Sequence, residues 1–201
     1  MSKTVEEAKR KELYQIIHDV LGQKYINLKF TKISIKEDYE DCDDSESSIC
    51  GTIEECQDKS CEEVSLHCSG NGIVDAIFSG MLDHYSEDYP SIRNISFEDF
   101  EVRPNFSNKS RSGSDAEVQV IIRLSNSSNR IMTFRHVGKS FVASSVIALT
   151  KAMEFYINSE QAFKKLKFLI SDAEKRNRSD IRQGYISKIS AIVKVTSYEN
   201  V

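Results

Sequence analysis

Residues 68–78 read Cys-Ser-Gly-Asn-Gly-Ile-Val-Asp-Ala-Ile-Phe, and they join a strand pattern to a helix pattern. Before this stretch, Val64, Leu66 and Cys68 alternate with polar residues, which is the period of a half-buried strand. After it, apolar residues recur at helical spacing as far as residue 85. A strand that runs through a glycine turn into a helix leaves backbone N–H groups at the positive end of the helix dipole. The turn therefore suits a carboxylate or phosphate, and the alternative is a turn that only reverses the chain.

The same order of patterns occurs twice in the chain. In the first unit an alternating strand slips by one residue between Phe30 and Ile33, and strands near 49–55 and 62–68 precede the glycine turn and a helix to about residue 88. In the second unit the slip lies between Phe97 and Phe100, strands follow at 116–124 and 131–136, and a helix opens at 138–140. Each slip predicts a bulge or a bend in the strand. The repetition predicts an α+β fold of internally duplicated βββα units, packed as a pseudo-symmetric domain.

The two ends of the chain lie outside this repeat. Residues 3–22 have the apolar stripe of an amphipathic helix, with Thr4 and Glu7 as a capping box and Gly22 as its stop. Beyond the repeat, helical character continues to Ile170, a charged segment at 172–182 breaks or frays the helix, and residues 185–196 have a strand-like pattern. We therefore expect an N-terminal helix over 1–23, a duplicated domain over 24–160 with units at about 24–90 and 94–158, and a C-terminal extension over 161–201.

Charge and hydropathy exclude several classes of protein. The 201 residues have a formal net charge of −4, which gives no global electrostatic basis for binding nucleic acid. The basic runs at 164–167 and 175–178 are typical of a solvated helix face. No apolar run has the length of a membrane span, and the N-terminus is charged rather than signal-like. These features predict a cytoplasmic protein that binds neither nucleic acid nor membrane.

The cysteines and acidic residues give no strong metal signal. The five cysteines, at 42, 50, 56, 61 and 68, are odd in number and include no C-x2-C pair, which favours reduced thiols over a disulfide framework or a zinc site. The acidic, serine-rich run at 37–48 is typical of a solvated loop, and a calcium site there would lack the EF-hand spacing and glycine. We predict no metal and no cofactor.

The glycine turn closely resembles a known regulatory motif. The residues from Gly70 to Ala76 (G-N-G-I-V-D-A) resemble the G-N-G-P-V-D-A of the C-terminal regulatory domain of 2-isopropylmalate and citramalate synthases, with Ile73 in place of the usual proline. Residues 115–118 resemble a strand of that domain, and residues 138–148 resemble its second glycine–serine–helix motif. In this second motif one glycine is replaced and an acidic residue near Phe141 is absent. Neither the catalytic barrel of that family nor its metal-binding histidine motif is present, so the resemblance implies a stand-alone, non-catalytic regulatory domain.

The resemblance also implies a ligand and a partner. In that family the domain dimerises and binds leucine or isoleucine near the two helix starts, so we expect a homodimer, or a complex with a separately encoded synthase subunit, and a small amino-acid effector. Backbone donors of the first turn would bind the carboxylate, and Asp75 would accept the ammonium or cap the helix. Ile73 and Ala76 would border an apolar slot or belong to the core. The expected ligand-binding residues are Gly70, Asn71, Gly72, Ile73, Asp75, Ala76, Gly138, Ser140, Ala143 and Ser144.

Two other functional classes remain open at this point. One is a dimerisation or protein-interaction module whose ligand site is silent. The other is an enzyme, for which the candidates His67, His84 and His136 show no nucleophile–base spacing in the sequence. We therefore predict no catalytic residue.

Overall fold

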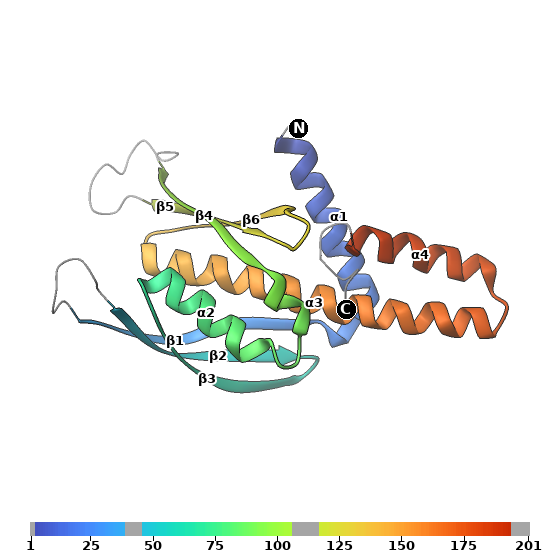
Figure 1. The fold of residues 1–201 in the computed structure, drawn as a ribbon, viewed down its shortest axis with the longest axis horizontal. Helices are drawn as coiled ribbons and strands as arrows, with labels where there is room; N and C mark the ends of the chain where they lie inside the picture. The colour runs from blue at the N-terminus through green and yellow to red at the C-terminus, as the bar shows by residue number, and fades with distance from the viewer. Residues whose placement is uncertain (1–2, 39–45, 106–116, 194–201) are drawn as a thin grey trace.

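The computed structural model describes residues 3–38, 46–105 and 117–193 (Figure 1). The first unit comprises β1 (Ile26–Asp38), β2 (Glu46–Gln57), β3 (Ser60–Gly70) and α2 (Ile73–Tyr85). The second comprises β4 (Ser96–Asn105), β5 (Glu117–Ser125), β6 (Ile131–Gly138) and α3 (Phe141–Lys175). Helices α1 (Lys3–Leu21) and α4 (Ser179–Val193) flank the units, and short 3₁₀ turns cover Gly22–Lys24 and Pro90–Asn94. Most of the acidic loop and of the second polar loop lies outside the described residues.

Each unit is an antiparallel three-stranded meander followed by a helix. The strand orders are β1-β2-β3 and β4-β5-β6. The register of β1 against β2 shifts between Phe30 and Lys32, and that of β4 against β5 shifts between Phe97 and Asp99. Both predicted bulges are thus confirmed at equivalent places. The duplicated βββα architecture of the α+β fold is confirmed with them.

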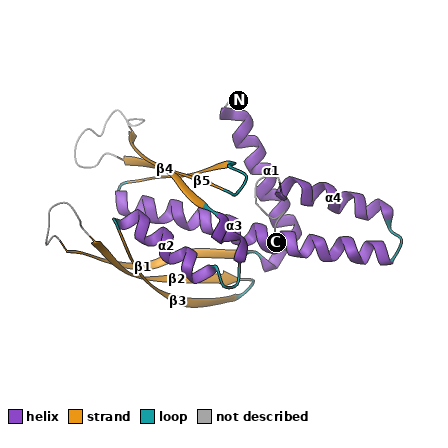
Figure 2. Ribbon diagram, in the orientation of Figure 1, coloured by secondary structure: helices purple, strands orange, loops and turns teal. Residues whose placement is uncertain are grey.

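Helices α2 and α3 lie between the two sheets (Figures 1 and 2). Helix α2 contacts β2 and β3, whereas α3 contacts β1 from the first sheet and β5 and β6 from the second. Phe78 of α2 also meets Phe97 of β4, with ring centroids 5.4 Å apart. The fully buried side chains include Ile53, Ile77 and Met81. One apolar core therefore joins both units, because α3 packs against both sheets and Phe78 of α2 reaches β4.

Two polar side chains on α3 fix the start of β1. The Asn158 amide accepts a hydrogen bond from Ile26 N at 2.8 Å and donates to Ile26 O at 2.7 Å and to Glu154 O at 2.8 Å. One turn earlier, the Glu154 carboxylate accepts from the Tyr25 hydroxyl and from Leu28 N, each at 3.0 Å. Asn158 is fully buried, so these bonds satisfy groups that could not reach water. The strand is thereby held in one position along the helix.

The N-terminal helix is confirmed. Helix α1 ends at Leu21, and Gly22 follows with a φ of +57°, in the left-handed region that glycine adopts without strain. The helix packs on α3, where the rings of Tyr14 and Phe155 lie 5.1 Å apart.

The C-terminal prediction is wrong in part. The charged segment does break the helix, at residues 176–178, but residues 185–193 form part of helix α4 rather than a strand. Tyr185, Ile189 and Val193 are spaced by four, and all three pack against the core, while Ile192 is fully buried. A spacing of four residues fits both the two-residue period of a strand and one turn of a helix. Packing on α1 and α3 favours the helix.

Helix α3 runs unbroken through residue 160, so the expected domain boundary falls inside it. Within the described ranges, no helix combines the length and apolar character needed to cross a membrane.

Candidate functional site

Helices α2 and α3 begin at the same end of the molecule (Figure 1) and contact each other. Each follows a glycine turn that leaves the last strand of its own sheet. The fold therefore brings the two predicted motifs, which are far apart in the sequence, to one end of the helix layer.

The first turn has an open helix N-terminus. Gly72 is the N-cap residue, with φ +98° and ψ 160°, and no side chain forms a cap hydrogen bond there. The first helical bond runs from Ala76 N to Gly72 O at 3.0 Å. The N–H groups of Ile73, Val74 and Asp75 therefore have no acceptor within the helix. Together with the helix dipole, they form a site suited to a carboxylate.

Gly70 allows the turn to pack tightly on the helix. A Cβ atom at this position would lie 2.8 Å from the Asp75 Oδ2 atom and 3.0 Å from Ala76 N. The Asp75 carboxylate thus lies over Gly70, is exposed, and does not cap the helix. Asp75 was expected either to cap the helix or to bind an ammonium group. The structure shows no capping hydrogen bond, and the exposed carboxylate is accessible to an ammonium group.

The remaining predicted residues of the first turn differ in exposure. Asn71 is exposed and Ile73 is half-buried, so both border the surface near the open N–H groups. Ala76 is fully buried in the core, which places its methyl group behind the turn rather than on the surface.

The second turn is capped by its own side chain. The Ser140 Oγ atom accepts a hydrogen bond from Ala143 N at 3.2 Å, and Ser144 N donates to Ser140 O at 2.9 Å. Ser140 and Ala143 are exposed. Because Ser140 takes up one of the free N–H groups, this helix start offers fewer donors to a ligand than the first.

A buried hydroxyl lies behind the second turn. Ser144 is 1% exposed, and its Oγ atom has no hydrogen-bond partner among the described residues. A Cβ at Gly138 would lie 2.8 Å from this oxygen and 3.5 Å from the His136 Nε2 atom. Partial burial, and then the positive charge of Lys151, lower the pKa of His136. His136 is thus a neighbour of the motif that the ligand-site prediction did not include.

The sulfur chemistry differs from the prediction. Cys56 and Cys61 form a disulfide, whereas the sequence favoured reduced thiols. The β2–β3 register places the two residues directly opposite each other, with Cα atoms 4.1 Å apart. The symmetric position of both cysteines around Asp58-Lys59 is the signal in the sequence that could have indicated the pairing.

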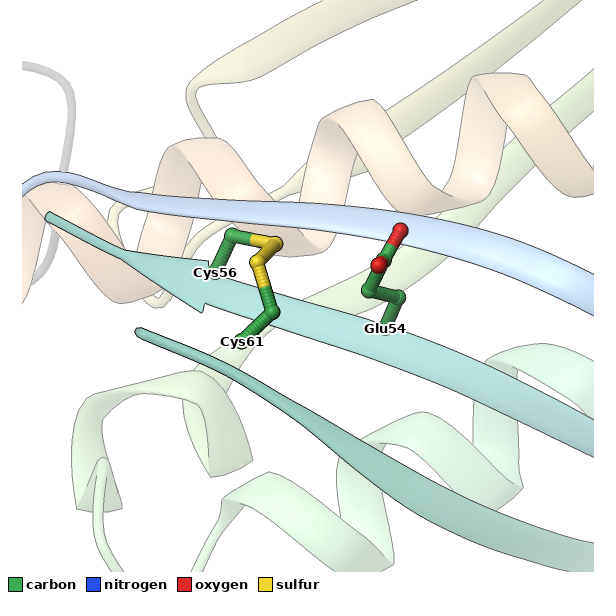
Figure 3. Close-up of side chains that lie close together, drawn as sticks. All are labelled: Glu54, Cys56 and Cys61. Atoms are coloured by element: carbon green, nitrogen blue, oxygen red, sulfur yellow. A yellow bond between two sulfur atoms is a disulfide. The ribbon is translucent and has the colours of Figure 1, made fainter. Parts of the chain in front are cut away.

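The group with metal-ligand chemistry lies at this disulfide. Glu54, Cys56 and Cys61 place their ligand atoms within 4.8 Å of one another, on one face of the hairpin (Figure 3). Zinc binds cysteine as thiolate, and both sulfurs are in the disulfide. In this form the group offers a metal ion only the Glu54 carboxylate.

The histidines considered for catalysis are separated in the structure. His67 lies across the strand pair from Cys50, with Nδ1 and Sγ 3.3 Å apart, a contact that sequence spacing did not reveal. Both side chains are exposed, and neither lines the groove between α1 and β6. His84 packs edge-on against Tyr85.

A comparison with protein families identifies a family that covers most of the chain. The model of the LeuA allosteric (dimerisation) domain matches residues 7–157, a range that includes most of α1, both sheets, both glycine turns and the first half of α3. A comparison with curated proteins gives no match.

Proposed function

We propose that this chain, which belongs to the family of LeuA allosteric (dimerisation) domains, binds a branched-chain amino acid or a similar small acid at the start of α2. The open N-terminus of α2, with three N–H groups free of helical acceptors, is the observation on which the proposal rests. A carboxylate placed there accepts hydrogen bonds from the backbone and interacts favourably with the helix dipole.

The other groups of an amino acid have candidate partners nearby. The exposed Asp75 carboxylate, in the first turn of α2, attracts an ammonium group. The half-buried Ile73 offers apolar surface to an aliphatic side chain. The second turn contributes less, because Ser140 already caps α3. On this basis α2 supplies the main contacts, Gly138, Ser140 and Ala143 form the neighbouring wall, and the buried Ser144 lies behind that wall.

Membership of the family also supports a proposal for the regulatory output. We propose that ligand binding to a dimer of this domain changes the activity of a separately encoded synthase catalytic subunit. The chain itself supplies the sensing and dimerisation function in this proposal, and the chemistry belongs to the partner.

Thermal denaturation with and without leucine, isoleucine and valine tests the ligand. Ligand at about 100 times its Kd stabilises a folded protein by about 2.7 kcal/mol, which shifts the melting temperature by several degrees. Leucinamide lacks the carboxylate and 4-methylpentanoate lacks the ammonium, so neither should reproduce the full shift. If no branched-chain amino acid or related 2-oxo or hydroxy acid shifts the melting temperature, the ligand proposal fails and the domain is a dimerisation module with a silent site.

Asp75→Asn tests the ammonium contact. We expect this variant to lose most of the ligand-induced shift while the melting temperature of the free protein stays within about 1 °C, because Asp75 forms no cap. Asp83→Asn, an exposed position on the same helix, is the matched control and should respond to ligand like the unmodified protein. Equal losses in the two variants would contradict a specific role for Asp75.

A further inference from the structure

A groove of about 450 Å³ lies between α1 and the layer formed by β6 and α3. Helix α1 contributes Arg10, Lys11 and Tyr14, strand β6 contributes Phe134 and Arg135, and α3 contributes Lys151. The lining that the structure describes contains no aspartate or glutamate. Four cationic side chains thus gather in one groove of a chain whose net charge is −4.

Packing holds the walls of the groove in place. The Arg10 Nη1 atom donates a hydrogen bond to Thr133 O, which ties α1 to β6. The Tyr14 ring packs on Phe155 of α3 with a centroid distance of 5.1 Å. Across the groove, the Lys151 Nζ atom lies 3.4 Å from His136 Nδ1. The cationic groups are therefore presented on three elements that are fixed relative to one another.

Two described carboxylates on α3 and α1, those of Glu154 and Asp19, face other partners. Both oxygens of Glu154 accept hydrogen bonds from the first residues of the β1 segment, and Asp19 accepts one from Gln15. Among the described residues, Lys11 and Lys151 form no ion pair. Neighbouring positive charges repel, and an anion between them removes that repulsion.

We infer that this groove binds a small molecule with two or more anionic groups, phosphate or carboxylate. A guanidinium group forms paired hydrogen bonds with either kind of oxyanion, and the lysines add point charges. The volume lies in the range of ligand sites, and Tyr14 and Phe134 give the groove an aromatic wall. Lys151 follows Phe141 by ten residues, about 15 Å along a helix, and the His136 ring lies between the Lys151 ammonium and Gly138 of the second glycine turn.

Isothermal titration calorimetry of the full chain at low salt tests this inference with inorganic pyrophosphate and with citrate. We expect one site per chain for at least one of them. Binding of pyrophosphate alone assigns the groove to phosphate compounds, and binding of citrate alone assigns it to carboxylates. Binding of both pyrophosphate and citrate shows that the groove accepts phosphate compounds and carboxylates alike. Added salt should weaken each interaction, since the contacts are between charges.

Charge-reversal variants locate the binding. Lys11→Glu and Lys151→Glu change exposed side chains on opposite walls, and each should weaken binding by at least about tenfold through loss of one attraction and gain of one repulsion. Lys59→Glu makes the same change in net charge on the exposed β2–β3 turn and should alter Kd by less than about twofold. The inference is overturned if neither anion binds at millimolar concentration, or if Lys59→Glu weakens binding as much as the groove variants.

Discussion

Gly70 and Gly72 lie in the same turn, but different physical constraints require glycine at the two positions. At Gly70 a side chain would collide with Asp75 and with the backbone of Ala76. At Gly72 there is open space, but the φ of +98° is strained for any residue that has a Cβ atom. The first position is therefore limited by packing, and the second by backbone conformation.

This distinction predicts the effect of Gly72→Ala. We expect it to reduce the free energy of unfolding by about 1–3 kcal/mol, because alanine must adopt the strained φ. Gly184→Ala in α4 is the matched control, since it meets nothing within 4 Å and has no positive φ. It should raise stability by up to about 1 kcal/mol through higher helix propensity. Urea denaturation of both variants measures the two values, and a loss of stability in both would contradict this account.

Asn158 gives a second prediction at the scale of single residues, with a defined pH dependence. In Asn158→Asp the Nδ2 donor becomes an oxygen that faces Ile26 O and Glu154 O, both of which are acceptors. At pH 7 we expect a loss of about 3–5 kcal/mol in the free energy of unfolding. Asn158→Ala should cost about 2–3 kcal/mol at any pH.

The sign of the pH effect follows from burial. Burial raises the folded-state pKa of the introduced carboxyl above its unfolded value of about 3.9. The unfolded chain then releases the proton first, so the variant loses stability as pH rises from about 4, by at most about 1.4 kcal/mol per pH unit. Urea denaturation at pH 4 and pH 7, relative to the unmodified protein, should show the larger difference at pH 7. An equal difference at both values would contradict the orientation of the amide.

At the scale of secondary structure, α3 is the element that breaks the symmetry of the two units. Helix α2 has 13 residues and α3 has 35. The first half of α3 lies between the sheets, and the second half forms an antiparallel hairpin with α4 (Figure 1). The turn between them uses Asn177 with a φ of +52°, a conformation that asparagine adopts more readily than most residues. The duplication thus ends where the helical extension begins.

The β2–β3 hairpin gives a prediction for reduction. The Cys56–Cys61 disulfide closes a ring of six residues, and a loop of this length stabilises the folded state by at most about 2 kcal/mol through the unfolded chain. Reductant should therefore lower the stability of the unmodified protein by up to this amount. The Cys56→Ser/Cys61→Ser double variant retains the other three cysteines, at 42, 50 and 68, and should not respond. A response of the double variant to reductant in thermal denaturation would assign the effect to another group.

At the scale of the whole molecule, membership of the family predicts a dimer. Light scattering coupled to size exclusion should give a mass near twice the 22.9 kDa of the chain. The test is independent of the ligand, because a silent site would leave the dimer in place. A mass of one chain over a tenfold range of concentration would show that this member does not self-associate under those conditions.

The sequence alone determined the features that depend on neighbouring residues. The duplication, the two bulges, helix α1 and both glycine turns follow from local periodicity and backbone conformation, and so do their positions within one or two residues. The residues of the candidate site were located in the same way, as the starts of two helices. The sequence pattern did not show which helix start keeps its N–H groups free for a ligand. That depends on the side-chain cap: Ser140 caps α3, whereas α2 has no side-chain cap.

Tertiary structure determined the features that join distant parts of the chain. Strand register paired Cys56 with Cys61 and placed His67 beside Cys50. Packing on α1 and α3 favours a helix at residues 185–193, where the apolar spacing fits both a strand and a helix. The cationic groove needs Arg10 to meet a strand 123 residues later. Such contacts leave no periodic signal, because each is set by the positions of two elements in space and not by the spacing of residues along one of them.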